Sequence, residues 1–147
     1  MLVRLEPDQI VKQWKHLREG VRMGLPPTAV NDDDRMANVL SSLLSGRTQM
    51  WGIYQDGKGE LAGGVVTVVL VEEITASKTL LIYCFFGYGP IARTSWQDSI
   101  TTLKTFAESQ GCEKMGAFTT HSGISELLKR RVSGVTEQTY IDIPVSA

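Results

Sequence analysis

At 147 residues the chain has the size of one domain, and with 42% hydrophobic and 21% charged residues its composition is typical of a folded protein. Fifteen basic and 16 acidic residues leave a formal net charge of −1, which gives no overall field to attract nucleic acid or an anionic membrane. We therefore expect a single domain over residues 1–147 that binds neither nucleic acid nor membranes.

Two further features bear on location and on metals. The cysteines, Cys84 and Cys112, make neither a disulfide framework nor a zinc-ligand spacing, which favours a reducing compartment and no bound metal. The apolar run at residues 62–71, AGGVVTVVLV, is about half of the roughly 20 residues that a membrane-spanning helix needs. These features predict a cytoplasmic protein.

Helical signals come first along the chain. Pro7 suits the first turn of a helix, and apolar residues recur at helical spacing until Gly24, where that helix should end. Asn31 or Asp32 can cap a second helix, and Gly46 is a natural stop for it.

Strand signals surround and follow these helices. Residues 1–5 alternate weakly between apolar and polar side chains, as a first strand does. Residues 49–55 and 60–73 read as two strands joined by a turn at 56–59, whose glycines tolerate positive φ. The apolar run at 79–86 predicts another strand, so the centre of the chain is expected to be an antiparallel meander.

The last third alternates between helix and strand. Apolar residues at helical spacing predict a helix over Ser95–Gln110, followed by a short strand within 113–120. Thr120 or Ser122 can cap a further helix, and alternation over 136–143 predicts a last strand. The expected fold class is α/β with a mixed sheet, in the order β-α-α-β-β-β-α-β-α-β.

This order of elements resembles the GNAT-type N-acetyltransferases. The likeness is clearest where a helix ending in TFAESQGC is followed by EKMGAFTT, a short helix containing ELLKRR and a closing strand. The resemblance implies a GNAT-like fold. In that family, a Gln/Arg-x-x-Gly-x-Gly/Ala loop before the long helix binds the pyrophosphate of coenzyme A through backbone N–H groups.

Counting back from Gln110-Gly111 places the corresponding loop at six consecutive residues: Ile91, Ala92, Arg93, Thr94, Ser95 and Trp96. Ile91 replaces the basic or amide residue, Thr94 replaces the inner glycine, and Trp96 stands at the last small position, where its indole would occupy phosphate space. Arg93 could still contact an anion. The family's proton-donating tyrosine is also replaced, by Lys129, and His121 is a candidate base by position only.

Because the motifs are degenerate, we expect a domain with a structural or protein-interaction role, without a cofactor, that binds a protein partner or assembles with itself. Domains of this kind are similar to bacteriophage and prophage proteins, which implies a phage-encoded protein and a virion location as an alternative to the cytoplasm. The alternative function is a divergent N-acetyltransferase that uses acetyl-CoA to modify an unknown amine. A third hypothesis is a small-ligand binding module that uses the gap between the middle strands.

Overall fold

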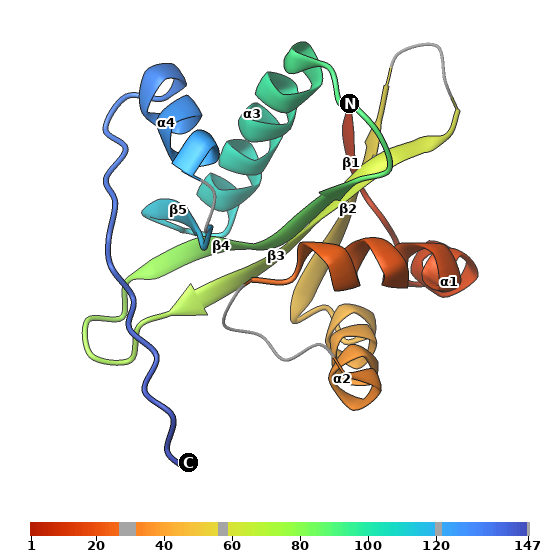
Figure 1. The fold of residues 1–147 in the computed structure, drawn as a ribbon, viewed down its shortest axis with the longest axis horizontal. Coiled ribbons are helices and arrows are strands. Elements are labelled where there is room, and N and C mark those ends of the chain that lie inside the picture. Colours follow the sequence, from red (N-terminus) through yellow and green to blue (C-terminus); the bar gives the residue numbers. More distant parts are fainter. Residues whose placement is uncertain (27–31, 56–58, 120–121, 147) are drawn as a thin grey trace.

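The structure is a computed structural model that describes residues 1–26, 32–55, 59–119 and 122–146. Within those ranges the chain forms five strands and four helices (Figure 1). The helices are α1 (Pro7–Gly24), α2 (Asp33–Leu44), α3 (Arg93–Ser109) and α4 (Ser122–Arg131). The strands are β1 (Leu2–Arg4), β2 (Thr48–Tyr54), β3 (Leu61–Val71), β4 (Lys78–Gly87) and β5 (Lys114–Ala117).

The strands form one sheet in the order β1-β2-β3-β4-β5. Pairing is antiparallel from β1 through β4, which confirms the meander predicted for the centre of the chain. β5 pairs with β4 in parallel, because the chain crosses over through α3 before it returns to the sheet edge. The mixed α/β fold class predicted from the sequence is thus confirmed.

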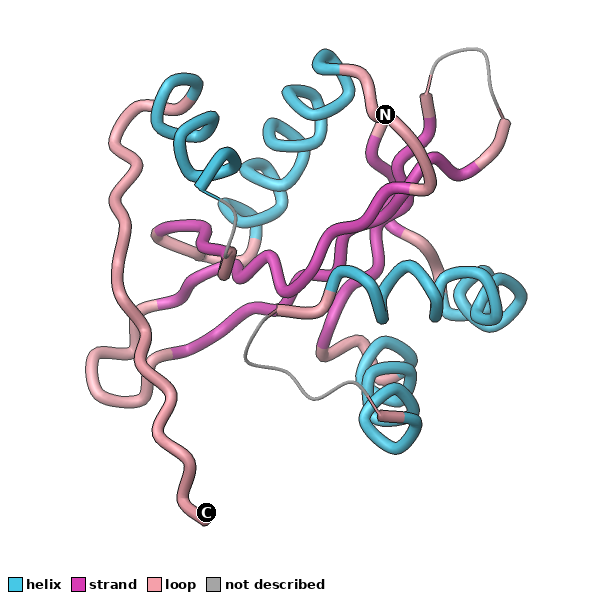
Figure 2. Tube along the Cα trace, in the orientation of Figure 1, coloured by secondary structure: helices cyan, strands magenta, loops and turns pink. Residues whose placement is uncertain are grey.

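Each face of the sheet carries its own hydrophobic core. α1 and α2 cover one face, and α3 covers the other, with α4 on the side of α3 (Figures 1 and 2). The first core joins the apolar sides of α1 and α2 to the sheet through Ile10, Leu17, Val21, Met36, Leu43, Met50, Val66, Cys84 and Phe86. The second joins α3 to the sheet through Leu103, Ala107, Trp51, Ile53, Val65 and Leu80. α4 has no fully buried residue.

A chain of buried hydrogen bonds crosses the sheet on the α3 side. The indole Nε1–H of Trp51 donates to Oγ1 of Thr67 over 2.9 Å, and that hydroxyl donates to Oε1 of Gln49 over 2.8 Å. All three side chains are buried, and each hydrogen bond offsets the desolvation of its partners.

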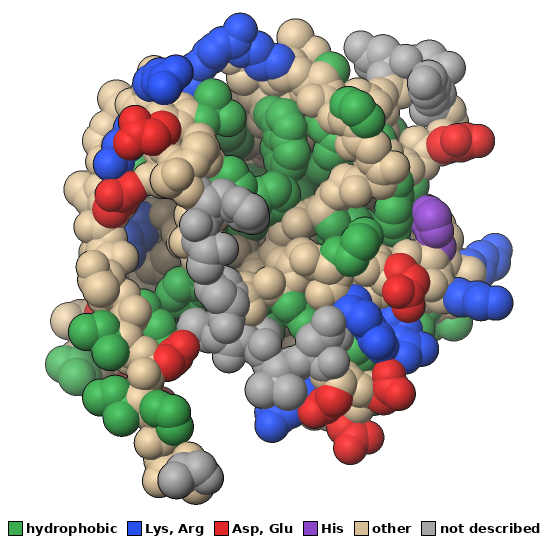
Figure 3. All heavy atoms as spheres, in the orientation of Figure 1, with side chains coloured by type: hydrophobic (Ala, Val, Ile, Leu, Met, Phe, Trp, Pro, Cys, Tyr) green, Lys and Arg blue, Asp and Glu red, His purple; other side chains and the backbone are tan. Residues whose placement is uncertain are grey.

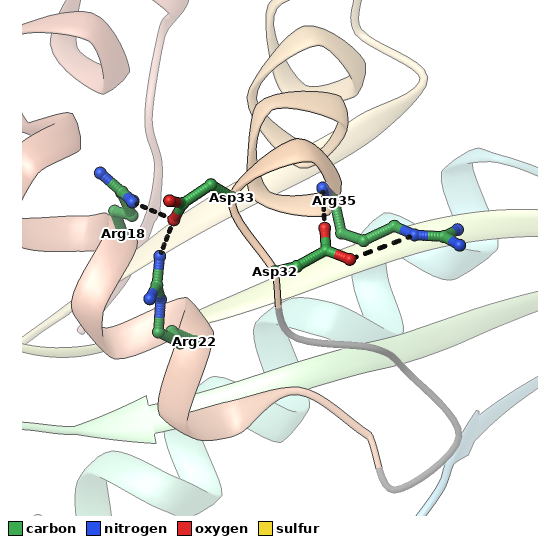
Figure 4. A network of polar contacts seen from close by, with 5 residues as sticks. All are labelled: Arg18, Arg22, Asp32, Asp33 and Arg35. Atoms are coloured by element: carbon green, nitrogen blue, oxygen red, sulfur yellow. Dashed lines mark hydrogen bonds and ion pairs between the residues drawn. The ribbon is translucent and has the colours of Figure 1, made fainter.

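Charged side chains tie α2 to α1 at the surface (Figure 4). Arg18 and Arg22 both donate to Oδ1 of Asp33, over 2.7 and 2.9 Å. The hydrogen bond from Arg22 and the charges of both arginines hold the pKa of the Asp33 carboxyl below its usual value. Next to these three residues, Asp32 caps α2, because its side chain accepts a hydrogen bond from the backbone N–H of Arg35 over 2.7 Å. Asp32 is one of the two residues that the sequence predicted as the cap of this helix.

The predicted last strand over 136–143 is wrong. Residues 132–146, all of them described, contain no strand after α4. Gly134, with φ of 77°, redirects the chain, and an ion pair between Lys129 and Glu137 holds the segment near α4. The segment then runs away from the sheet (Figure 2), so its alternating residues have no strand beside them to pair with. Other predicted features, namely the tip of the 56–59 turn and the caps Asn31 and Thr120, lie outside the described residues.

Candidate functional site

β4 and β5 run together for only four residues and then separate. Their register extends from Thr79 opposite Lys114 to Ile82 opposite Ala117. On its other edge β4 carries a bulge, since Cys84 lies opposite Val66 while Ile82 lies opposite Thr67. The extra residue, Tyr83, follows directly after the last β5 contact. A bulge bends and twists a strand, and this one lies where the pairing of β4 with β5 ends.

A cavity of about 430 Å³ lies at this separation. Its walls come from β4, from the segment after β5, from the end of α1 and from α4. The described lining residues are Met23, Gly24, Leu25, Pro26, Ile82, Tyr83, Cys84, Phe85, Ala117, Phe118, Thr119 and Ile124. The bulged part of β4 therefore faces an open space where a neighbouring strand would otherwise lie.

A second cavity of about 370 Å³ adjoins the first and leads towards α3. The two share Met23, Gly24 and Phe85, and the second is also lined by Phe86, Gly87, Gly89, Ile91 and Trp96. Figure 3 shows hydrophobic side chains around a hollow on this side of the molecule, in the region that Figure 1 shows between β4, α3 and α4. Together the cavities make an apolar cleft from β5 to the start of α3.

The start of α3 closes one end of this cleft. Ala92 is the residue before the helix; its N–H donates to Oε1 of Gln55 over 3.0 Å, and its carbonyl accepts from the N–H groups of Ser95 and Trp96. No side chain caps the helix. Arg93, its first residue, is exposed. Such a helix start favours an anion, because its first N–H groups have no partner within the helix.

The six residues predicted as the phosphate loop therefore do not form one loop, and they differ in secondary structure and exposure. α3 begins at Arg93, two residues before the predicted start, so most of the expected loop is helical. Ile91 and Trp96 line the cleft, whereas Ala92, Arg93 and Thr94 are exposed at the helix end and Ser95 is buried. The Trp96 indole packs edge-on against Phe85, with ring centroids 5.3 Å apart.

Among the described residues, the cleft lining carries no Asp, Glu, Lys, Arg or His side chain. Burial raises the pKa of the Tyr83 phenol, and burial raises the pKa of the Cys84 thiol to about 12. Both groups are therefore protonated at neutral pH, which makes Cys84 a poor nucleophile and leaves Tyr83 with a proton to donate. Sequence reasoning placed Tyr83 in a buried strand and missed its position in the cleft.

Two other sequence candidates lie elsewhere. Lys129 is exposed and pairs with Glu137 over 3.0 Å, outside the lining of either cavity. His121 lies outside the described residues. Over the ranges that the structure covers, no three His, Cys, Asp or Glu residues gather as a metal site would require, and no helix is long and apolar enough to cross a membrane.

No protein-family model and no curated protein sequence matches the chain. Solved structures do. A probable acetyltransferase has a TM-score of 0.73 at 9% identity, with 100% of this chain and 99% of that chain covered. AAC(6')-Iy, bound to the bisubstrate analogue CoA-S-monomethyl-acetylneamine, has a TM-score of 0.73 at 13% identity, with coverage of 100% and 98%. A ribosomal-protein-alanine N-acetyltransferase from Brucella melitensis biovar Abortus 2308 has a TM-score of 0.69 at 14% identity, with 98% of this chain and 97% of that chain covered. With its mixed five-stranded sheet and its cleft between two parallel strands, the chain therefore has the fold of the GNAT acetyltransferases.

Proposed function

We propose that the protein binds acetyl-CoA in the cleft between β4 and β5 and transfers the acetyl group to an amine. The observation that carries this proposal is the bulge at Tyr83, which lies where the pairing of β4 with β5 ends and where the cavity begins. The proposal replaces our sequence-based preference for a structural role without a cofactor. The structures named above are described as acetyltransferases, and nothing in them supports a phage origin or a virion role.

The residues present suit a thioester of this kind. Beyond Ile82, no strand among the described residues pairs with β4 on its β5 side, so we expect backbone groups there to accept an extended amide-containing chain. The apolar lining suits an acyl group and the alkyl part of such a chain. The uncapped start of α3, with Arg93 exposed beside it, suits phosphates. AAC(6')-Iy has also been solved in complex with CoA.

When bound, the thioester supplies an activated acyl carbon. Transfer breaks its C–S bond and forms a C–N bond; the amine loses a proton and the departing sulfur needs one. Tyr83, protonated at neutral pH and part of the cavity wall, is the candidate donor of that second proton. The amine must be deprotonated to attack the acyl carbon. The apolar lining favours the neutral amine over the ammonium ion, because burial disfavours the charged form.

The first experiment is a thermal-shift and calorimetric titration with acetyl-CoA. A ligand at 100 times its Kd stabilises the folded state by about 2.7 kcal/mol, which corresponds to roughly 5–11 °C in Tm for a chain of this size. Arg93→Ala should weaken binding. Lys104→Ala is the matched control, because Lys104 is also exposed on α3 but lies about 16 Å further along the helix.

Absence of saturable binding at millimolar acetyl-CoA would contradict the proposal. Binding that Arg93→Ala and Lys104→Ala weaken equally would place the ligand away from the start of α3. Binding without acetylation of any amine would favour the small-ligand module over the enzyme.

A further inference from the structure

The end of the cleft beside β5 is walled by apolar side chains from three parts of the chain. Met23 comes from the last turn of α1, Phe118 directly follows β5, and Ile124 lies on α4. Leu25 and Pro26, which continue from α1, add to the same wall. None of these residues belongs to the start of α3, where the proposed function expects the phosphates of the donor. This end of the cleft is therefore the part that is left for the acceptor amine.

Two of the large apolar side chains at this end are exposed. Met23 is 70% exposed and Phe118 is 41% exposed, although the Phe118 ring already contacts Tyr140 with ring centroids 5.7 Å apart. Apolar groups left open to solvent in a concave site favour a ligand that covers them. Methionine is also unbranched and flexible, so Met23 can adapt its shape to an alkyl chain or to a ring. The exposed surface thus suits an apolar substituent on the acceptor.

Among the residues that the structure describes, no charged side chain lines this end of the cleft. The segments 27–31 and 120–121, which adjoin the lining in sequence, contain no acidic residue. The next carboxylates after α1 have other roles, since Asp33 accepts hydrogen bonds from two arginines of α1 and Asp32 caps α2 (Figure 4). A cationic group buried against the described lining would find no carboxylate there to offset its lost hydration.

We propose that the acceptor is a primary monoamine whose single substituent is apolar, either an alkyl chain or an aromatic ring, and that this substituent lies against Met23, Phe118 and Ile124. The inference rests on the proposed function for the reaction itself. In that reaction the amine nitrogen bonds to the acyl carbon, the C–S bond breaks, the nitrogen releases its proton and the sulfur takes one. The product is a neutral amide, so no charge remains in the apolar end of the cleft.

The same lining disfavours an acceptor with several amino groups. Each amino group that does not react stays an ammonium ion at neutral pH and must either remain in water or lose its hydration without a partner. An aminoglycoside carries several such groups. The chain therefore shares its fold with the aminoglycoside N-acetyltransferase AAC(6')-Iy, but we expect it to take a different class of amine.

A matched pair of small amines tests this preference. Heptylamine and 1,6-diaminohexane have the same number of non-hydrogen atoms, and they differ in whether the far end is a methyl group or an ammonium ion. Calorimetric titration at pH 9 without acetyl-CoA should give saturable binding of heptylamine, about tenfold tighter than binding of 1,6-diaminohexane. With acetyl-CoA present, thiol release should show the same order in kcat/KM, with neamine, an aminoglycoside, no better than the diamine.

A charged variant tests where the substituent lies. Met23→Glu places a carboxylate at this end of the cleft and should shift the affinity ratio towards the diamine by about threefold. Val11→Glu is the matched control, because Val11 is also an exposed apolar residue of α1, at 58%, but lies about 18 Å back along the helix and outside the lining of both cavities. Both variants should keep the Tm of the unmodified chain, since neither side chain is buried.

The outcomes separate this inference from the proposed function. Transfer from acetyl-CoA to 1,6-diaminohexane or neamine at least as fast as to heptylamine overturns the inference and leaves the acetyltransferase in place. No saturable binding of heptylamine, with or without acetyl-CoA, overturns it too, as does an equal shift in Met23→Glu and Val11→Glu. Preferential binding of heptylamine by a chain that does not bind acetyl-CoA supports the apolar amine site and contradicts the proposed function alone.

Discussion

Gly20 is a position where α1 packs tightly on a side chain of β4, and replacing it with alanine tests that packing. Gly20 is buried, and a Cβ added there would overlap Cδ2 and Cε2 of Phe86 and lie 2.9 Å from its Cγ. Phe86 is 4% exposed, packs edge-on against Tyr88 with centroids 5.5 Å apart and has Gly64 close to the far end of its ring, so the ring can shift only towards the cavity that it lines. Either this ring, α1 or β4 must move.

Two opposing effects decide the sign of the change in stability. Alanine favours a helix interior over glycine by about 1 kcal/mol. Overpacking of a tight core costs about 1–3 kcal/mol, and the buried ring at this site argues for the upper end of that range. Gly20→Ala should therefore lower the free energy of unfolding by about 2 kcal/mol, or the Tm by roughly 4–8 °C.

Urea unfolding followed by circular dichroism measures the effect against a matched helical control. Gly123, in α4, has no atom within 4 Å of an added Cβ, so Gly123→Ala should be neutral or stabilise the protein by up to about 1 kcal/mol. Combining Gly20→Ala with Phe86→Leu should recover part of the loss. If Gly20→Ala proved as stable as the unmodified chain, α1 could not pack on β4 as closely as the structure has it.

Three other perturbations test separate parts of the structure. Thr67→Val leaves the Trp51 indole N–H without its acceptor and should cost about 1–3 kcal/mol in urea unfolding; a neutral result would mean that the hydroxyl is not needed there. Asp33→Asn should lower stability at pH 7, and the loss should fade below about pH 4 and in molar salt, because the lowered pKa of the carboxyl stabilises the fold only while it is ionised. Cys112 alone should react with a thiol reagent at pH 8, since burial raises the pKa of Cys84 to about 12; two rapidly reacting thiols would contradict that burial.

Sequence patterns predicted the parts of the fold that local chemistry determines. α1 starts at Pro7 and ends at Gly24, and α2 follows its Asp32 cap, as the helix signals indicated. The start of α3 was placed two residues late, because its N-cap, Ala92, has no side chain that could mark it. Local signals thus define a helix end where a capping side chain, a proline or a glycine marks it.

The features that depend on distant residues could not be predicted in this way. The run LLIYCFF looks like an uninterrupted strand, and nothing in it marks Tyr83 as the bulged residue. The cleft exists because β4 and β5 separate there, which depends on how far β5 extends. The alternation of apolar and polar side chains over 136–143 favours a strand, but it does not determine whether another strand lies beside it to pair with.

The hydrogen bonds among Gln49, Trp51 and Thr67 have a further consequence for folding accuracy. β3 is almost uniformly apolar, with valine on both sides of Thr67, so hydrophobicity alone would tolerate β2 sliding along it. A slip by one residue would move the Thr67 hydroxyl to the opposite face and leave a buried indole N–H and a buried amide without partners. The single threonine in the valine run therefore fixes the alignment of the two central strands and penalises misaligned folding intermediates.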